Sequence, residues 1–220
     1  MQAGKTYIGV DVQSARGCPF AVLNADARMI RNGWLQDAAG LRQLVTLLAA
    51  EGAVVVGIDA PRMPVTAPRQ WASERGRWVR KSVERGRHCE VVVRSLGLAN
   101  PQWTPLAKDA EPWMQLGFAM FRSLAGLPHV VVHEVFPSAS YRMFEVGQAP
   151  SVTLSLTSFE PGPKDMLDAI VAAVTIREFT EGRGSEIGGG DGMGTMILPR
   201  PLTTVQAQNF SMRWPAGVDA

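Results

Sequence analysis

Cysteine is scarce in this sequence, and its scarcity excludes one class of protein. Only two of the 220 residues are cysteines, and Cys18 and Cys89 lie far apart along the chain. A disulfide scaffold needs more cysteines than this, and so few indicate a reducing compartment. His88, Cys89 and His133 also have none of the spacings of a structural zinc site. A chain of this length can bury a substantial core without either kind of cross-link.

Long apolar runs and a targeting leader are missing as well. No apolar run approaches the roughly 20 residues that cross a bilayer. Residues 1–5 run directly into an alternating apolar segment, without the basic start and long apolar stretch of a signal peptide. We therefore expect a cytoplasmic protein.

A strong charge of one sign is lacking too. The formal net charge is +2, which is too small to identify a nucleic-acid-binding protein. The distribution is uneven, however, because basic residues gather between residues 69 and 94. This basic segment fits either a solvated helix face or a phosphate-binding surface. Its basic residues are Arg69, Arg75, Arg77, Arg80, Lys81, Arg85, Arg87 and Arg94.

What the sequence does contain is the pattern of an α/β domain. Residues 6–12 are rich in β-formers and predict a first strand, and residues 20–23 and 28–31 predict a hairpin around a polar turn. Apolar residues at helical spacing predict a helix over 37–51. Residues 53–59 form a continuous apolar run, which is typical of a strand that helices cover on both faces.

A second buried strand is predicted at 129–134, and a helix at 165–179. The interval 60–127 is far longer than a strand–helix–strand crossover needs. We interpret it as a helical insertion, with helices around 71–85 and 111–125.

The predicted fold is thus an α/β domain over residues 1–200. Its mixed five-stranded sheet combines three antiparallel strands with two parallel ones. Residues 201–220 form a C-terminal arm. Residues 188–194 are rich in glycine but lack the lysine and hydroxyl of a phosphate-binding loop, so they predict a connector or a loop at the substrate edge.

Acidic residues mark the ends of the predicted core strands. Asp11, Asp59 and Glu134 each lie at or near a strand end, and Asp168 lies on the predicted helix 165–179. Carboxyl ends of neighbouring parallel strands share one edge of a sheet, where ligands gather. Each acid on its own fits a capping residue equally well. Together they predict a carboxylate cluster with catalytic and metal-binding roles.

Clustered carboxylates repel one another, and a cation relieves the repulsion. Mg²⁺ or Mn²⁺ is the expected cofactor because hard divalent ions prefer oxygen ligands. Two such ions can activate water and stabilise the leaving oxygen during phosphodiester cleavage.

The chain also resembles a known family through an ordered set of short motifs. They are Ile8-Gly9-Val10-Asp11, Gly57-Ile58-Asp59-Ala60-Pro61, Arg87-His88-Cys89-Glu90, Thr104-Pro105, Glu134-Val135-Phe136-Pro137-Ser138, Leu167-Asp168-Ala169-Ile170-Val171-Ala172-Ala173, Asp191-Gly192 and Ile197-Leu198-Pro199. This order resembles the domain-of-unknown-function 429 family, which is regarded as RNase H-like nucleases. The resemblance implies an RNase H-like fold, with Asp11, Asp59, Glu134 and Asp168 at positions that match the family's metal site.

Candidate substrate-binding residues are Arg87, Glu90, Arg94 and Lys164. Arg87 and Arg94 suit a phosphate clamp, although Arg87, Glu90 and Arg94 at positions i, i+3 and i+7 also fit an ion-pair ladder on a helix surface. Tryptophans among the arginines can stack on bases, but such residues are more often core or interface anchors. These tryptophans are Trp71, Trp78, Trp103 and Trp113.

The leading hypothesis is a divalent-metal-dependent nuclease or phosphodiesterase whose partner is nucleic acid. One alternative is a non-catalytic module that binds nucleic acid or protein on the same scaffold. The other is an ATP-dependent phosphotransferase of the actin and sugar-kinase class. That class normally duplicates its core, whereas 220 residues leave room for one copy.

Overall fold

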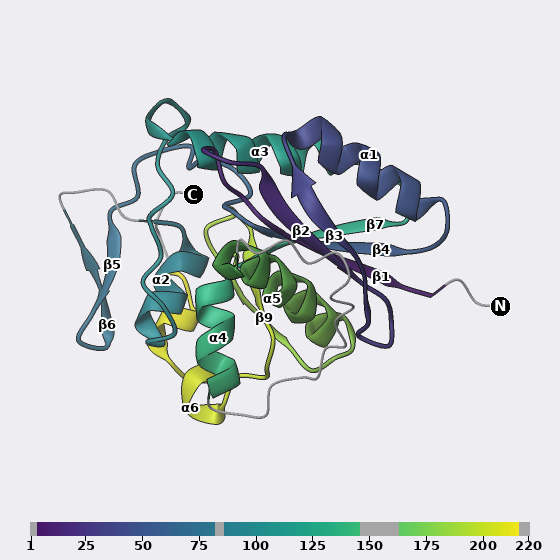
Figure 1. Ribbon diagram of the computed structural model, residues 1–220. Helices are drawn as coiled ribbons and strands as arrows, with labels where there is room; N and C mark the ends of the chain where they lie inside the picture. The colour runs from purple at the N-terminus through teal and green to yellow at the C-terminus, as the bar shows by residue number, and fades with distance from the viewer. Residues whose placement is uncertain (1–3, 82–85, 146–162, 216–220) are drawn as a thin grey trace.

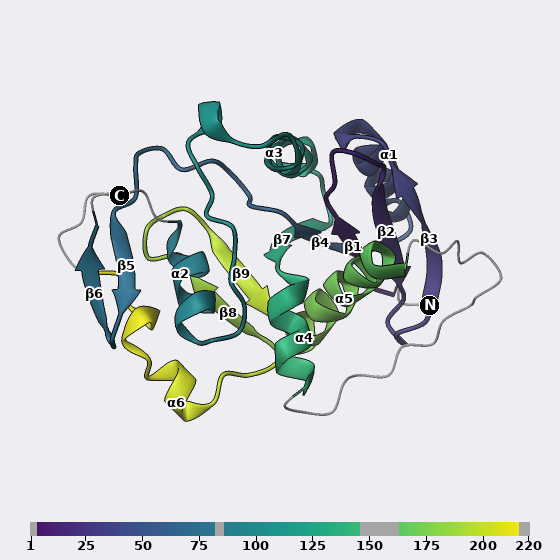
Figure 2. The ribbon, with the colours of Figure 1, turned by 60° about the vertical axis from the view of Figure 1, so that its left-hand side comes forward.

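One mixed sheet of seven strands organises the molecule, in the order β3-β2-β1-β4-β7-β9-β8. The computed structural model describes residues 4–81, 86–145 and 163–215. Strands β1, β2 and β3 pair antiparallel, β4 and β7 continue from β1 in parallel, and β9 runs parallel to β7. Figures 1 and 2 show helices on both sides of the sheet. The strands of this sheet are β1 (Thr6–Asp11), β2 (Cys18–Leu23), β3 (Met29–Leu35), β4 (Val54–Asp59), β7 (Val130–Val135), β8 (Ser185–Gly188) and β9 (Thr195–Leu198).

The predicted α/β class and mixed sheet are confirmed, but the predicted number of five strands is wrong. The two further strands, β8 and β9, lie on either side of the glycine-rich residues 188–194, which connect them. Gly188, Gly189, Gly192 and Gly194 have positive φ angles there, a conformation that costs glycine little. They fold the chain back so that the apolar β9 can extend the sheet beside β7.

The helices divide between the two faces of the sheet (Figure 1). Helices α1 and α3 pack on one face and contact each other, whereas α5 covers β1, β2 and β4 on the other. Asp37 caps α1 by accepting a hydrogen bond from the backbone N–H of Gly40 at 2.8 Å. The helices are α1 (Ala38–Ala49), α2 (His88–Ser95), α3 (Pro112–Leu124), α4 (Pro137–Glu145), α5 (Pro163–Thr180) and α6 (Thr204–Ala207), with short 3-10 helices at Ala107–Asp109 and Phe210–Met212.

The helix predicted over 71–85 is wrong within the described residues. Two short strands, β5 (Trp71–Glu74) and β6 (Arg77–Arg80), form a hairpin there. Arg75 and Gly76 at its tip both have positive φ angles, the geometry that suits a two-residue hairpin turn. The hairpin lies beside α2 and away from the main sheet (Figure 2), and residues 82–85 lie outside the described part.

The C-terminal residues pack against this hairpin and α2. The indole N–H of Trp78 donates to the carbonyl of Arg213 at 2.9 Å, and the His88 ring bonds the carbonyl of Ser211 at 2.7 Å. The described part of the predicted arm, residues 201–215, is therefore tied to the inserted region.

Close contact between β1 and α5 positions the sheet edge that carries the acids. Gly9 faces the backbone of α5, and a Cβ at Gly9 would overlap the carbonyl of Ala169 and the amide nitrogen of Ala173. Small side chains on α5, such as Ala172, complete the contact. A larger residue at position 9 would therefore push the helix away from the sheet.

We expect Gly9→Ala to lower the free energy of unfolding by about 1–3 kcal/mol, the usual cost of overpacking a core. Urea denaturation of the two proteins would measure the difference. Gly4→Ala is the matched control because a Cβ at Gly4 meets no atom within 4 Å. Equal stability of Gly9→Ala and the wild type would show that α5 is not held this tightly.

Candidate functional site

Two of the predicted acids stand side by side at the end of the sheet. Asp11 and Asp59 are register partners on the parallel strands β1 and β4. Adjacent strands lie about 4.8 Å apart, and partnered residues point to the same face. Asp168 reaches this face from α5 and influences the ionisation of both residues. Three of the predicted site residues are thus brought together by the fold.

Burial and repulsion between neighbouring charges make Asp11 and Asp59 hard to ionise. Desolvation, opposed by a 2.7 Å hydrogen bond from the Gln13 amide, raises the pKa of Asp11 to about 6, and the Asp168 charge adds to the increase. The pKa of Asp59 is raised well above its usual value by burial first and then by the charges of Asp11, Asp168 and Glu134. Within the described residues, the Asp59 carboxyl has no hydrogen-bond donor. A half-buried carboxyl without a donor, next to other acids, favours a proton or a bound cation.

Asp168 has more side-chain partners than Asp11 or Asp59. The Tyr141 hydroxyl donates to its Oδ1 at 2.8 Å, and the Lys164 ammonium contacts its Oδ2 at 3.0 Å. This hydrogen bond and the Asp168 charge raise the pKa of Lys164. Lys164, a predicted substrate-binding residue, is therefore at the site, with a side chain that is 79% exposed.

Glu134 lies at the same sheet edge but has a different environment. Arg87 binds it with two guanidinium nitrogens, at 2.8 and 2.5 Å, and the backbone N–H of Arg62 donates to it at 2.9 Å. Glu134 is a register partner of Ile58, not of Asp59, so its side chain leaves the strand on the other face. A permanent arginine partner thus occupies the carboxylate predicted as the fourth metal ligand.

Arg87 and Glu90 were predicted to belong either to a phosphate clamp or to an ion-pair ladder on a helix surface, and the structure shows neither. Arg87 is 1% exposed and Glu90 is 2% exposed. Arg87 Nη2 binds Glu90 at 2.8 Å as well as Glu134, and Glu90 accepts a hydrogen bond from the Thr104 hydroxyl. Arg87 and Glu90 are therefore neither a surface ladder nor a free phosphate clamp. They form a buried ion-pair network that anchors α2 to the end of β7.

Arg94, the fourth predicted substrate-binding residue, lies apart from this network. It is exposed, and its guanidinium stands over the ring of Trp103 at 5.3 Å from the ring centre. The basic segment 69–94 is accordingly split between buried residues, Arg69 and Arg87, and exposed ones, Arg75, Arg77, Arg80 and Arg94.

A pocket of about 370 Å³ opens over the acidic edge of the sheet. Asp11, Asp59 and Glu134 line it, together with Arg87, Trp113 and Met196. Among the residues that the structure describes, no three His, Cys, Asp or Glu side chains are arranged to hold a metal ion. The pocket therefore offers an open pair of carboxylates, Asp11 and Asp59, and not a closed metal cage.

Two supporting residues had no signal in the sequence. Tyr141 comes from α4, and its bond to Asp168 crosses from one helix to another. Gln13 follows β1 by two positions and turns back to Asp11. Neither residue belongs to a spacing pattern, so only the folded chain shows their role.

Comparisons with protein-family models, with curated proteins and with solved structures found no match. Within the described residues, no helix combines the length and the apolar character that crossing a membrane requires.

The ionisation of Asp11 predicts a pH dependence of stability. Its pKa rises from 3.8 to about 6 on folding, so the folded protein binds more protons than the unfolded chain between these values. The contribution of Asp11 to stability is therefore most favourable below about pH 4 and is lost as the pH rises through 6, by on the order of 3 kcal/mol. Asp11→Asn removes the titrating group, and its stability relative to the wild type is expected to increase over this window.

Urea denaturation at pH 4 and pH 7, without divalent metal, would measure this effect. Asp26→Asn, at an exposed turn, is the matched control and should show no comparable change. A variant less stable than the wild type at pH 7 would mean that Asp11 is held by favourable partners.

Proposed function

We propose that this protein is a divalent-metal-dependent nuclease or phosphodiesterase on an RNase H-like scaffold. The observation that carries the proposal is the register pairing of Asp11 and Asp59 at the carboxyl ends of β1 and β4, beside Asp168. Buried carboxyls without cationic partners destabilise a fold, and a bound divalent cation would relieve that cost. A bound divalent cation would therefore stabilise the folded site.

The donor set fits Mg²⁺ or Mn²⁺. Magnesium is commonly held by one or two carboxylates together with waters and substrate phosphates, without an all-protein cage. Asp11 and Asp59 supply two such carboxylates in the lining of the pocket. Asp168 stands beside this pair, and its bonds to Tyr141 and Lys164 fix the direction of its carboxylate. Glu134 is left out of the proposed ligand set because Arg87 holds it.

A bound divalent cation would supply an activated water and would stabilise the leaving oxygen. The chain's own residues contribute the rest of the site. Asp11 and Asp59 would hold the cation at the pocket, and the buried Arg87–Glu134 pair fixes the end of the neighbouring strand. The exposed ammonium of Lys164 can bind a substrate phosphate while it remains close to Asp168.

The topology supports the RNase H-like part of the proposal. Three antiparallel strands, β3-β2-β1, are followed in the sheet by the parallel strands β4 and β7. This is the arrangement that the family resemblance implies, with the acids at the carboxyl ends of its central strands. Strands β8 and β9 add to this core at the far edge.

A panel of labelled single-stranded, double-stranded and hybrid nucleic acids, incubated with Mn²⁺, tests the proposal. We expect the wild type to cleave at least one member of the panel and Asp11→Asn to lose that cleavage. Asp26→Asn should cleave like the wild type. Equal cleavage by the wild type and Asp11→Asn would assign the activity to a contaminant and remove the support for this site.

A non-catalytic binding module is the second candidate, and the Arg87–Glu134 pair favours it because it withdraws one of the four predicted carboxylates. Calorimetric titration with Mn²⁺ separates the two functions. A nuclease should bind the ion with an affinity that falls in Asp59→Asn, whereas a binding module should show no affinity that depends on these carboxylates.

A further inference from the structure

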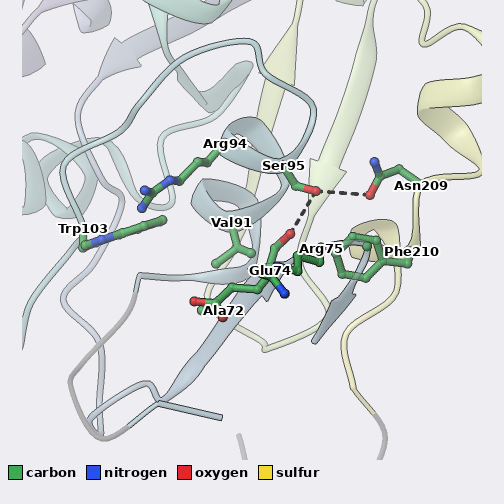
Figure 3. A pocket seen from close by; sticks show the side chains of 11 residues that line it. Ala72, Glu74, Arg75, Val91, Arg94, Ser95, Trp103, Asn209 and Phe210 are labelled. Carbon is green, nitrogen blue, oxygen red and sulfur yellow. Dashed lines mark hydrogen bonds between the residues drawn. The ribbon is translucent and has the colours of Figure 1, made fainter. Parts of the chain in front are cut away.

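A second pocket, on the other side of α2, has no role in the proposed chemistry. It has a volume of about 450 Å³ and lies between the β5–β6 hairpin, α2 and the C-terminal 3-10 helix. Figure 3 shows Trp103 with Arg94 on one side of the pocket and Phe210 on the other. Trp103 and Phe210 thus flank a space large enough for a planar group.

The floor of this pocket is polar and ordered. The Ser95 hydroxyl donates to the Asn209 side-chain oxygen at 3.2 Å and accepts a hydrogen bond from the Ser73 hydroxyl at 3.2 Å. These bonds join α2, the hairpin and the C-terminal segment (Figure 3). The hydroxyls of Ser73 and Ser95 and the amide of Asn209 can form hydrogen bonds with the edge of a ligand. Hydroxyl and amide groups can both donate and accept such bonds.

The ring of Trp103 is held firmly in place. Gly86 packs against it so closely that a Cβ at Gly86 would overlap the indole. Arg94 lies over the ring at 5.3 Å, which adds a cation–π contact. A base that enters the pocket would replace the guanidinium over the indole, and the displaced guanidinium could then meet a phosphate of the same strand.

The surface around the pocket carries an excess of positive charge. Arg75 and Arg94 line the pocket, with Glu74 as the acidic residue, and Glu74 is paired with Lys81. Arg77 and Arg80 are exposed on the same hairpin. A polyanion is therefore a better ligand for this surface than a neutral aromatic molecule.

The pocket also adjoins the acidic site. Glu90 and Gln102 line the acidic pocket, while their chain neighbours Val91 and Trp103 line this one. From Arg87 to Arg94 the α2 segment rises about 10 Å. At roughly 3.4 Å per stacked nucleotide, a strand of about three nucleotides would span that distance.

We propose that the pocket formed by Trp103, Arg94, Phe210, Ser95 and Asn209 binds an unpaired base of a single-stranded nucleic acid, a few nucleotides from the phosphate that the proposed cation would hold near Asp11 and Asp59. This inference rests on the proposed function and specifies its substrate class. A paired base presents no free face to Trp103, so double-stranded nucleic acid would not fill the pocket.

Fluorescence anisotropy with labelled oligonucleotides of roughly ten nucleotides, in EDTA at fixed ionic strength, tests the proposal. We expect the single strand to bind more tightly than the matching duplex. Trp103→Leu should weaken single-strand binding roughly tenfold or more, as loss of base stacking does. Arg94→Gln should weaken it about two- to fivefold.

Trp34→Leu and Arg31→Gln, on the opposite edge strand β3, are the matched controls and should bind like the wild type. Thermal melting would show whether Trp103→Leu folds. If it does not fold, Arg94→Gln and Phe210→Leu decide the question. Wild-type affinity in every folded pocket variant, or equal affinity for single strand and duplex, would overturn the proposal.

The cleavage assay with Mn²⁺ keeps this inference distinct from the proposed function. Binding that depends on Trp103 without any cleavage would support the pocket and contradict the nuclease. Cleavage that depends on Asp11 but is the same in Trp103→Leu would contradict the pocket and support the nuclease.

Discussion

Replacing Arg87 with methionine is expected to lower the free energy of unfolding by about 3–5 kcal/mol, the usual cost of breaking a buried ion pair from one side. Arg87 is the cation that holds both Glu90 and Glu134, and all three are at most 2% exposed. Methionine fills a similar length but leaves both carboxylates buried without a charge partner. Denaturation in urea would measure the loss.

Two further proteins make this prediction specific. Arg94→Met removes an arginine from the exposed end of the same helix and should change stability by less than about 1 kcal/mol. The triple variant Arg87→Met, Glu90→Gln, Glu134→Gln also removes the two carboxylate charges that Arg87 neutralised. It should recover part of the lost free energy of unfolding. A single Arg87→Met variant as stable as the wild type would mean that the network contributes nothing.

If the protein is the proposed nuclease, replacing Asp59 with asparagine should reduce its metal-dependent cleavage by at least about 100-fold. Removing even a residue that only contacts a metal ligand costs about 10- to 100-fold. Asp59 is the most isolated acid of the site, with no hydrogen-bond donor among the described residues and raised proton affinity. The asparagine side chain keeps the shape but loses the charge. The kcat/KM for the best substrate of the panel would measure the effect.

Stability separates a loss of chemistry from a loss of folding in this variant. Asp59→Asn removes a carboxyl that burial and three neighbouring acids disfavour, so its melting temperature without metal should equal or exceed that of the wild type. Asp109→Asn, on an exposed 3-10 helix, should leave both properties unchanged. Full cleavage by a folded Asp59→Asn would remove this residue from the site.

The acidic edge could be predicted because it depends on local patterns. The continuous apolar runs before Asp59 and Glu134 require strands that are covered on both faces, and parallel strands bring their carboxyl ends together. Asp11 and Asp59 followed directly from this rule. The helix predicted at 165–179 is confirmed as α5, Pro163–Thr180.

The β5–β6 hairpin in the inserted region could not be predicted from the sequence, for a physical reason. Residues 71–80 contain residues that fit a helix or a strand, and the outcome depends on the turn at Arg75-Gly76 and on packing against α2 and Phe210. Strand β9 is only four residues long, and a segment this short becomes a strand only when a partner such as β7 is already in place.

By itself, the sequence determined the α/β class, the parallel central strands and the position of Asp11 and Asp59 at their ends, because strand periodicity and burial act over a few neighbouring residues. Only the tertiary structure decided which of these acids are paired with an arginine. Glu134 looks the same as Asp59 in the sequence, but Arg87, 47 positions away, neutralises it in the folded chain. Charge pairing in a buried site depends on distance in space, and the linear order of residues does not specify that distance.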